Sequence, residues 1–115
     1  MSPSPPDLLR HILAEIEFLL AEARQVSRDE FLGDPALRRA FVRSLEIIGE
    51  AAKLLPEEFR EASPDIPWAG MAGMRDRLIH HYFGVDYELV WDVVAAKAPP
   101  LARQIQELLA GIEES

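Results

Sequence analysis

The sequence contains no cysteine, and it has no apolar run of the roughly 20 residues that are needed to cross a bilayer. The absence of cysteine excludes disulfide bonds and thiolate metal sites, and it is compatible with a reducing cytosol. The opening residues, MSPSPPD, have neither a basic n-region nor an apolar h-region, so we expect no signal peptide. These absences together predict a cytoplasmic protein that makes no use of a membrane.

Positive charge is also scarce, because 12 Lys and Arg residues stand against 20 Asp and Glu residues, for a net charge of −8. This balance argues against broad, non-specific binding of nucleic acid, which depends on the neutralisation of phosphates. The basic residues nevertheless gather in two groups, which are Arg38, Arg39 and Arg43, and Arg75 and Arg77. If the two groups meet in the fold, they form a small positive pocket in an acidic protein.

The first half of the chain carries three starting signals for helices. A Pro/Ser-rich stretch at 1–6, for which we expect disorder, precedes Asp7, which can cap the first helix. The segment SRDE at 27–30 matches a capping box and predicts a short helical turn. Asp34-Pro35 places a capping residue before a proline at the first helical position, and an apolar face then continues as far as Pro56.

The second half of the chain carries one long connection and two further helices. The connection, residues 56–67, contains three prolines. A third helix is predicted from about 67 to 80 or 82, with Gly84 just past its end. Asp86 should cap the fourth helix, which the Pro99-Pro100 pair must kink or break, because proline removes a backbone donor and clashes with the preceding turn.

The fold class follows from these four amphipathic patterns and their mostly short links. They predict an all-α protein, an antiparallel four-helix bundle with a kinked or broken C-terminal helix. The 115 residues fit one domain, which we place at residues 7–112. No segment of the sequence is a candidate for a β-strand.

The segment MRDRLIHHYFG at 74–84 concentrates polar functional groups. On a continuous helix, Asp76 and His80 lie one turn apart on the same face, so Asp76 can accept a hydrogen bond from His80 and orient it for acid–base chemistry. Arginine is well suited to hold a phosphate, but Arg75 lies about 140° around an ideal helix from His80. A long side chain or a loosened last turn is needed to bring both residues to one site.

The same residues also fit simpler explanations. Arg77, His80 and His81 suit a helix C-terminus, where basic residues offset the helix dipole. A metal site is a weaker interpretation, because the adjacent His80 and His81 point in different directions and only Asp76 is well placed nearby. We expect neither a bound metal nor a cofactor.

Residues 75–82 spell R-x4-H-x-Y, with a polar residue directly after the arginine. This motif resembles that of the HEPN superfamily, and specifically that of HepT, the toxin of the bacterial HepT–MNT toxin–antitoxin systems. The likeness extends to FVRSLEIIGEAAKLLP at 41–56, which is similar to the second long helix of the family. It extends also to IPWAGMAGMRDRLIHHYFGVDYELVWDVV at 66–94, which is similar to the motif helix and the segment that follows it.

The resemblance implies a HEPN-like metal-independent endoribonuclease that acts as a homodimer, with one composite RNA-cleaving site at the subunit interface. On the matching residues, His80 would act as general base or acid, Arg75 would stabilise the phosphorane and Asp76 would orient them. In HepT-type systems a minimal nucleotidyltransferase antitoxin silences the toxin by adding AMP to the motif tyrosine, which is Tyr82 here. We add Arg77 and His81 as candidate contacts to RNA phosphates.

Two other classes of function remain open at this point. The bundle could be a non-catalytic partner or nucleotide-binding subunit of a nucleotidyltransferase, in which residues 74–84 recognise a nucleotide phosphate. It could also be a helical dimer in which the motif provides only helix-end electrostatics. Cleavage of RNA would separate the ribonuclease from both alternatives.

Overall fold

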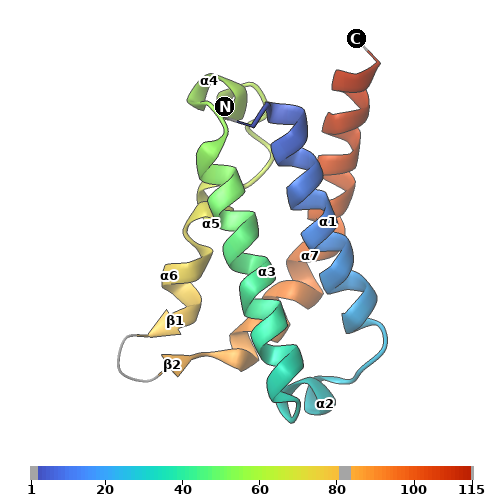
Figure 1. Ribbon diagram of the computed structural model, residues 1–115, viewed down its shortest axis with the longest axis vertical. Coiled ribbons are helices and arrows are strands. Elements are labelled where there is room, and N and C mark those ends of the chain that lie inside the picture. The colour runs from blue at the N-terminus through green and yellow to red at the C-terminus, as the bar shows by residue number, and fades with distance from the viewer. Residues whose placement is uncertain (1–2, 81–83, 115) are drawn as a thin grey trace.

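The protein is built around three long helices that lie side by side (Figure 1). The computed structural model describes residues 3–80 and 84–114, and for Ile79 and His80 it describes the backbone alone. The long helices are α1 (Pro5–Ala23), α3 (Pro35–Leu54) and α7 (Tyr87–Glu113). Helix α1 runs antiparallel to the other two and packs against both of them, as expected for a helical bundle.

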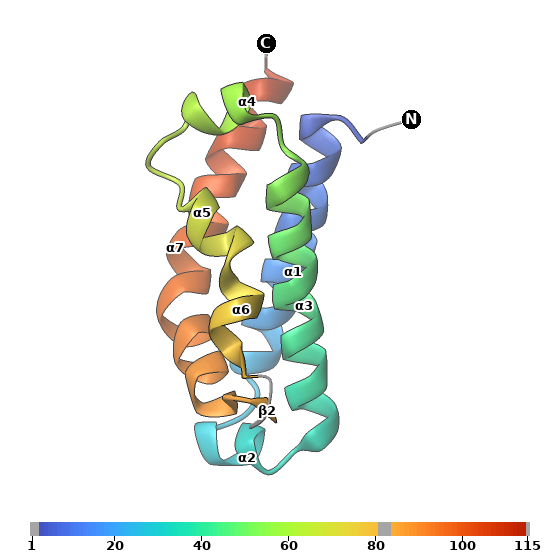
Figure 2. The same cartoon turned by 90° about the vertical axis from the view of Figure 1, so that its left-hand side faces the viewer.

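The fourth position of the bundle is filled by two short helices, α5 (Trp68–Ala72) and α6 (Met74–Leu78), which pack against α3 (Figure 2). The prediction of one continuous helix from 67 to 80 or 82 was therefore wrong at two points. Gly73 caps the C-terminal end of α5 and separates it from α6, because α5 closes there with a hydrogen bond from the Gly73 N–H to the Ala69 carbonyl.

The second departure is a small β-hairpin that follows α6. Strand β1 (Ile79–His80) pairs antiparallel with β2 (Gly84–Val85), so the expectation of no strand was wrong. Leu78 is buried, and its carbonyl accepts a hydrogen bond from the Asp86 N–H at 2.9 Å, which draws the two sides of the hairpin together. Gly84 has a φ of 76°, a conformation that favours glycine, and it lies within this strand rather than at a helix end.

The helix starts depend on side-chain caps. The capping box at 27–30 is confirmed at the start of α2 (Arg28–Leu32), and Asp34 caps α3 as predicted. Helix α1 begins at Pro5 rather than near Asp7, because the Ser4 side chain accepts a hydrogen bond from the Asp7 N–H. The last two residues of the stretch expected to be disordered, 1–6, are therefore helical.

Helix α7 is continuous through Pro99 and Pro100, so of the two predicted outcomes, a kink or a break, the break does not occur. Figure 1 shows its orange first half inclined to its red second half, as expected for a helix that bends where proline removes hydrogen bonds. The other short helix is α4 (Glu57–Glu61), which lies in the long connection. In the described parts of the chain, no helix is both long enough and apolar enough to span a membrane.

The core joins the helices of the bundle, and α3 and α5 approach each other closely within it. An ideal Cβ placed on Gly49 would lie 2.8 Å from the carbonyl oxygen of Met71. No real side chain tolerates that distance, so glycine at this position lets α5 approach α3 closely. Trp68 and Met71, both on α5, are buried in the resulting contact.

Gly49→Ala should destabilise the protein, because the added methyl group forces α5 away from α3. We expect the free energy of unfolding to fall by about 1–3 kcal/mol, the usual cost of overpacking, as measured by urea denaturation. Gly111→Ala in α7 is the matched control, since a Cβ there meets no atom within 4 Å. An unchanged denaturation midpoint for Gly49→Ala would show that the contact is not as close as described.

Candidate active site

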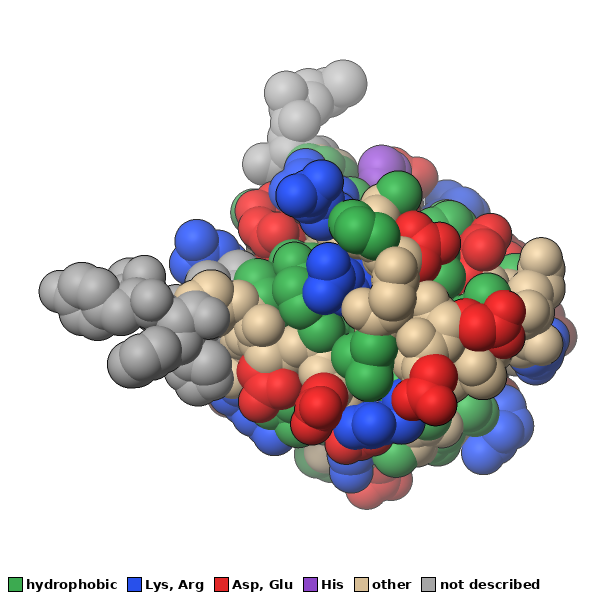
Figure 3. Space-filling view, turned by 90° about the horizontal axis from the view of Figure 1, so that it is seen from below, with side chains coloured by type: hydrophobic (Ala, Val, Ile, Leu, Met, Phe, Trp, Pro, Cys, Tyr) green, Lys and Arg blue, Asp and Glu red, His purple; other side chains and the backbone are tan. Residues whose placement is uncertain are grey.

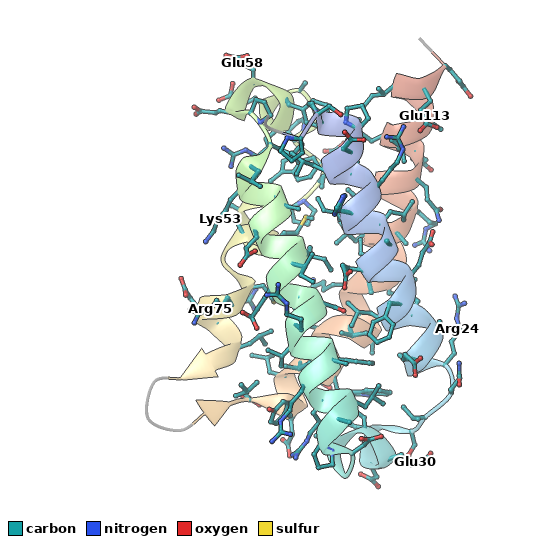
Figure 4. The ribbon with its side chains drawn as sticks, viewed as in Figure 1. Arg24, Glu30, Lys53, Glu58, Arg75 and Glu113 are labelled. Atoms are coloured by element: carbon teal, nitrogen blue, oxygen red, sulfur yellow. The ribbon has the colours of Figure 1, made fainter. Side chains whose placement is uncertain are left out.

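The arginine of the motif, Arg75, lies on the exposed surface of α6 beside α3 (Figure 4). Its side chain is 60% exposed. The Arg75 Nε atom lies 3.8 Å from a carboxylate oxygen of Glu46 on α3, and one Nη atom lies 3.8 Å from a carboxylate oxygen of Asp76. These distances exceed those of hydrogen bonds, so the guanidinium keeps donors free for an incoming anion.

Asp76 is more exposed still, at 85%, and its one ion pair among the described residues is with Arg75. The predicted Asp76–His80 hydrogen bond assumed that both residues lie on one helix. They do not, because α6 ends at Leu78 and His80 belongs to β1. A role for Asp76 in orienting His80 therefore stays a prediction.

His80 occupies the hairpin, where its backbone pairs with that of Gly84. The hairpin stands at the edge of the bundle beside the lower part of α3 (Figure 1). His81 and Tyr82 lie outside the described residues. The motif is thus divided between two elements, with its two arginines on a helix and its first histidine on a strand.

Arg77 lies on a different side of α6 from Arg75. Residues two positions apart on a helix point about 200° away from each other. Arg77 faces a groove between the α5–α6 segment and α7. Lys97 and Gln104 of α7 also line this groove, and its apolar lining includes Met71, Met74 and Leu101. The condition for one positive pocket, that both arginines of the motif meet those of α3, is therefore not met among the described residues: Arg75 lies beside Glu46 of α3, whereas Arg77 faces the groove toward α7.

Sequence reasoning did not include Glu46 or Lys97 among the site residues. Glu46 lies beside Arg75 because α6 packs on α3, and Lys97 lines the same groove as Arg77 because α7 closes that groove. Both arrangements bring together segments that are far apart in sequence. The helical pattern could have shown that these residues face outward, but no local signal shows which element lies opposite them.

The lower end of the molecule mixes basic and acidic side chains (Figure 3). Part of this mixing consists of ion pairs, since Arg28 lies 3.7 Å from both Glu88 and Asp92. The described surface in this view shows no continuous basic area, in agreement with the net charge of −8. An anionic ligand would accordingly be bound by a few individual Lys or Arg side chains rather than by an extended positive electrostatic potential.

Metal-binding side chains do not cluster in the part of the chain that the structure describes. No group of three or more His, Cys, Asp or Glu residues there could hold an ion.

Comparison with known proteins identifies the family. A family model described as "Ribonuclease HepT-like" matches residues 11–108. The chain belongs to the HepT-like ribonuclease family. This membership confirms the resemblance drawn from R-x4-H-x-Y and from the flanking segments.

Three relatives are matched over most of their own length. A protein named as a putative RNase from Caldanaerobacter subterraneus subsp. tengcongensis is 52% identical over 106 residues, which are 92% of this chain and 95% of the relative. Another named as a putative RNase, from Methanocaldococcus jannaschii, is 46% identical over 91% of this chain and 87% of its own. A protein named probable ribonuclease HepT, from Thermococcus cleftensis, is 42% identical over 94% of this chain and 98% of its own. No solved structure matches this chain.

Replacing Arg75 or its partner on α3 should leave the fold intact. Because the Arg75 side chain is 60% exposed and its ion pairs are long, we expect Arg75→Ala and Glu46→Gln to change the free energy of unfolding by less than about 1 kcal/mol. Urea denaturation followed by circular dichroism measures this change. A larger loss for either variant would mean that the Arg75–Glu46 pair holds α6 on α3.

Proposed function

We propose that this protein is a metal-independent endoribonuclease and the toxin of a toxin–antitoxin system. The observation that carries the proposal is that a HepT-like ribonuclease has the complete R-x4-H-x-Y motif at 75–82, with its arginine exposed and only loosely paired. Arg75 is therefore accessible to a phosphate, and the motif supplies His80 as the candidate acid–base group.

The proposed reaction is attack of a ribose 2′-hydroxyl on the adjacent phosphate. His80 removes the proton from the 2′-oxygen as this oxygen bonds to phosphorus, and the bond from phosphorus to the 5′-oxygen breaks. The leaving 5′-oxygen takes up a proton, which leaves a 2′,3′-cyclic phosphate and a 5′-hydroxyl. Arg75 stabilises the extra negative charge of the phosphorane, and Asp76 orients the charged groups.

The proposed active unit is a homodimer with the two motif copies at its interface. Within one chain, Arg75 is on α6 and His80 is on β1, beyond the end of that helix. A second copy of the hairpin could supply a histidine close to the first chain's arginine. The position of the hairpin at the edge of the bundle, rather than in its core, supports this arrangement (Figure 1). Arg77 and His81 would contact neighbouring phosphates.

The proposed control of the toxin is covalent modification by a minimal nucleotidyltransferase. This antitoxin would attach AMP to the Tyr82 hydroxyl, two residues after His80, and the bulky nucleotide would block access of RNA. Both partners would act in the cytoplasm, where RNA is available.

Cleavage of labelled RNA by the purified protein in EDTA tests the proposed activity. After intact mass has shown that Tyr82 carries no AMP, the parent should cleave, whereas Arg75→Ala and His80→Ala should lose at least about a hundredfold in rate, the usual contribution of an acid–base or charge-stabilising group. Equal rates for either variant would refute its assigned role. A parent that binds RNA or nucleotides but cleaves no RNA in a broad panel would instead be a binding module.

Tyr82→Phe tests the proposed control separately. The variant keeps the ring but lacks the hydroxyl that would accept AMP, so it should cleave RNA like the parent and should remain active after treatment with the nucleotidyltransferase and ATP. Intact mass should show the addition of AMP to the parent alone. A variant that is silenced as well as the parent would place the modification on another residue or make it unnecessary.

A further inference from the structure

Arg38 on α3 is held in a different way from the neighbouring arginines. Its guanidinium carbon lies 4.6 Å from the centroid of the Tyr87 ring, which is a cation–π contact. Its Nε atom is buried and has no hydrogen-bond partner. Arg39 and Arg43, on the same helix, are exposed. The fold therefore fixes the position of one arginine of this group.

Arg38 also forms no ion pair with any carboxylate that the structure describes, although the protein is strongly acidic. Two acids near these elements in sequence are engaged elsewhere. Asp34 accepts a hydrogen bond from the Leu37 N–H at the start of α3, and Asp86 accepts one from the Leu89 N–H at the start of α7. A partly buried cation without a counter-ion is costly, so Arg38 is suited to an anion that binds from outside.

The contact between Arg38 and Tyr87 lies at the base of the hairpin that carries the motif. Tyr87 is the first residue of α7, and it follows Gly84, the backbone partner of His80, by three residues. A chain segment of that length spans at most about 11 Å when fully extended. The backbone of Tyr87 is therefore anchored within about 11 Å of Gly84, the residue that pairs with His80.

We propose that Arg38, positioned by Tyr87, binds a phosphate of the RNA chain next to the one that is cleaved. The inference rests on the ribonuclease function proposed above. Tyr87 occupies one face of the guanidinium, and the edge of the Nη groups can still donate two parallel hydrogen bonds to one phosphate. Arg38 binds and positions RNA, and it takes no part in proton transfer.

The alternative is that Arg38 only joins α3 to α7. Salt dependence separates the two roles. Affinity for RNA falls as salt rises, and each phosphate contact on a single strand steepens the slope of log affinity against log salt concentration by about 0.7. A contact that merely joins two helices leaves this slope unchanged.

The test uses the full chain with His80→Ala, so that bound RNA stays intact, and a fluorescent single-stranded RNA at several salt concentrations. Adding Arg38→Ala should weaken binding about tenfold, the effect of losing a charge-assisted hydrogen bond, and should lower the salt slope by about 0.7. Arg24→Ala is the control, because Arg24, like Arg38, forms no ion pair among the described residues, but it is exposed and lies near the end of α1 on the opposite side of the molecule from Arg75 (Figure 4).

Substitutions of Tyr87 test how Arg38 is held. Tyr87→Phe keeps the ring face and should bind RNA like the parent, whereas Tyr87→Leu should lower affinity. If Arg38→Ala unfolds, Arg38→Lys keeps the charge without the planar fork. It should then weaken binding while the salt slope stays near that of the parent.

The outcomes distinguish this inference from the proposed function. If the parent cleaves RNA and Arg38→Ala binds as Arg24→Ala does, with the same affinity and slope, the role of Arg38 is refuted and the ribonuclease stands. If the unmodified parent neither binds nor cleaves RNA, the proposed function fails, and the role of Arg38 fails with it.

Discussion

The close approach of α5 to α3 at Gly49 is the constraint on which the site depends. Because glycine leaves room for the Met71 carbonyl, α5 seats against α3, and α6 continues along the same helix face. That seating places Arg75 beside Glu46 and leaves Arg77 over the groove that α7 closes. One small residue on α3 thus determines where both arginines of the motif point.

The hairpin depends on a second constraint, which is the burial of Leu78. This side chain anchors the end of α6 in the core, and its carbonyl binds the Asp86 N–H immediately before α7. The backbone leaves α6 through β1 and enters α7 from β2, and these two strands pair antiparallel beside this bond. The hairpin is consequently a product of its two anchored ends, and the bundle can present it at its edge without using it as core.

Much of the fold could be predicted from local patterns. The starts of α2 and α3 are predicted by capping side chains that bind backbone N–H groups within three residues. The structure confirms the caps formed by Ser27, Glu30 and Asp34. The division of the third helix at Gly73 could not be predicted in this way, because glycine inside a helical pattern costs only about 1 kcal/mol and does not by itself end a helix. The packing of α5 on α3 involves partners that are distant in sequence, and no local pattern shows it.

The motif of the candidate site could be predicted from the sequence, but the positions of its residues in the fold could not. The spacing R-x4-H-x-Y and its flanking segments were enough to identify the family. The expected helical relation between Asp76 and His80 failed because α6 ends at Leu78, which follows from core packing rather than from the motif. The contact of Arg38 with Tyr87 joins residues 49 positions apart, and no pattern along the chain indicates such a pair.

The two ends of the described chain meet at the pole of the bundle opposite the hairpin (Figure 1). Arg10 joins them there, since its guanidinium binds Asp7 of the first turn of α1 and Glu113 of the last turn of α7. A polypeptide attached at either end would leave the bundle at that pole, away from the motif. The fold therefore offers points of attachment for another module at the pole away from the surface on which Arg75 lies.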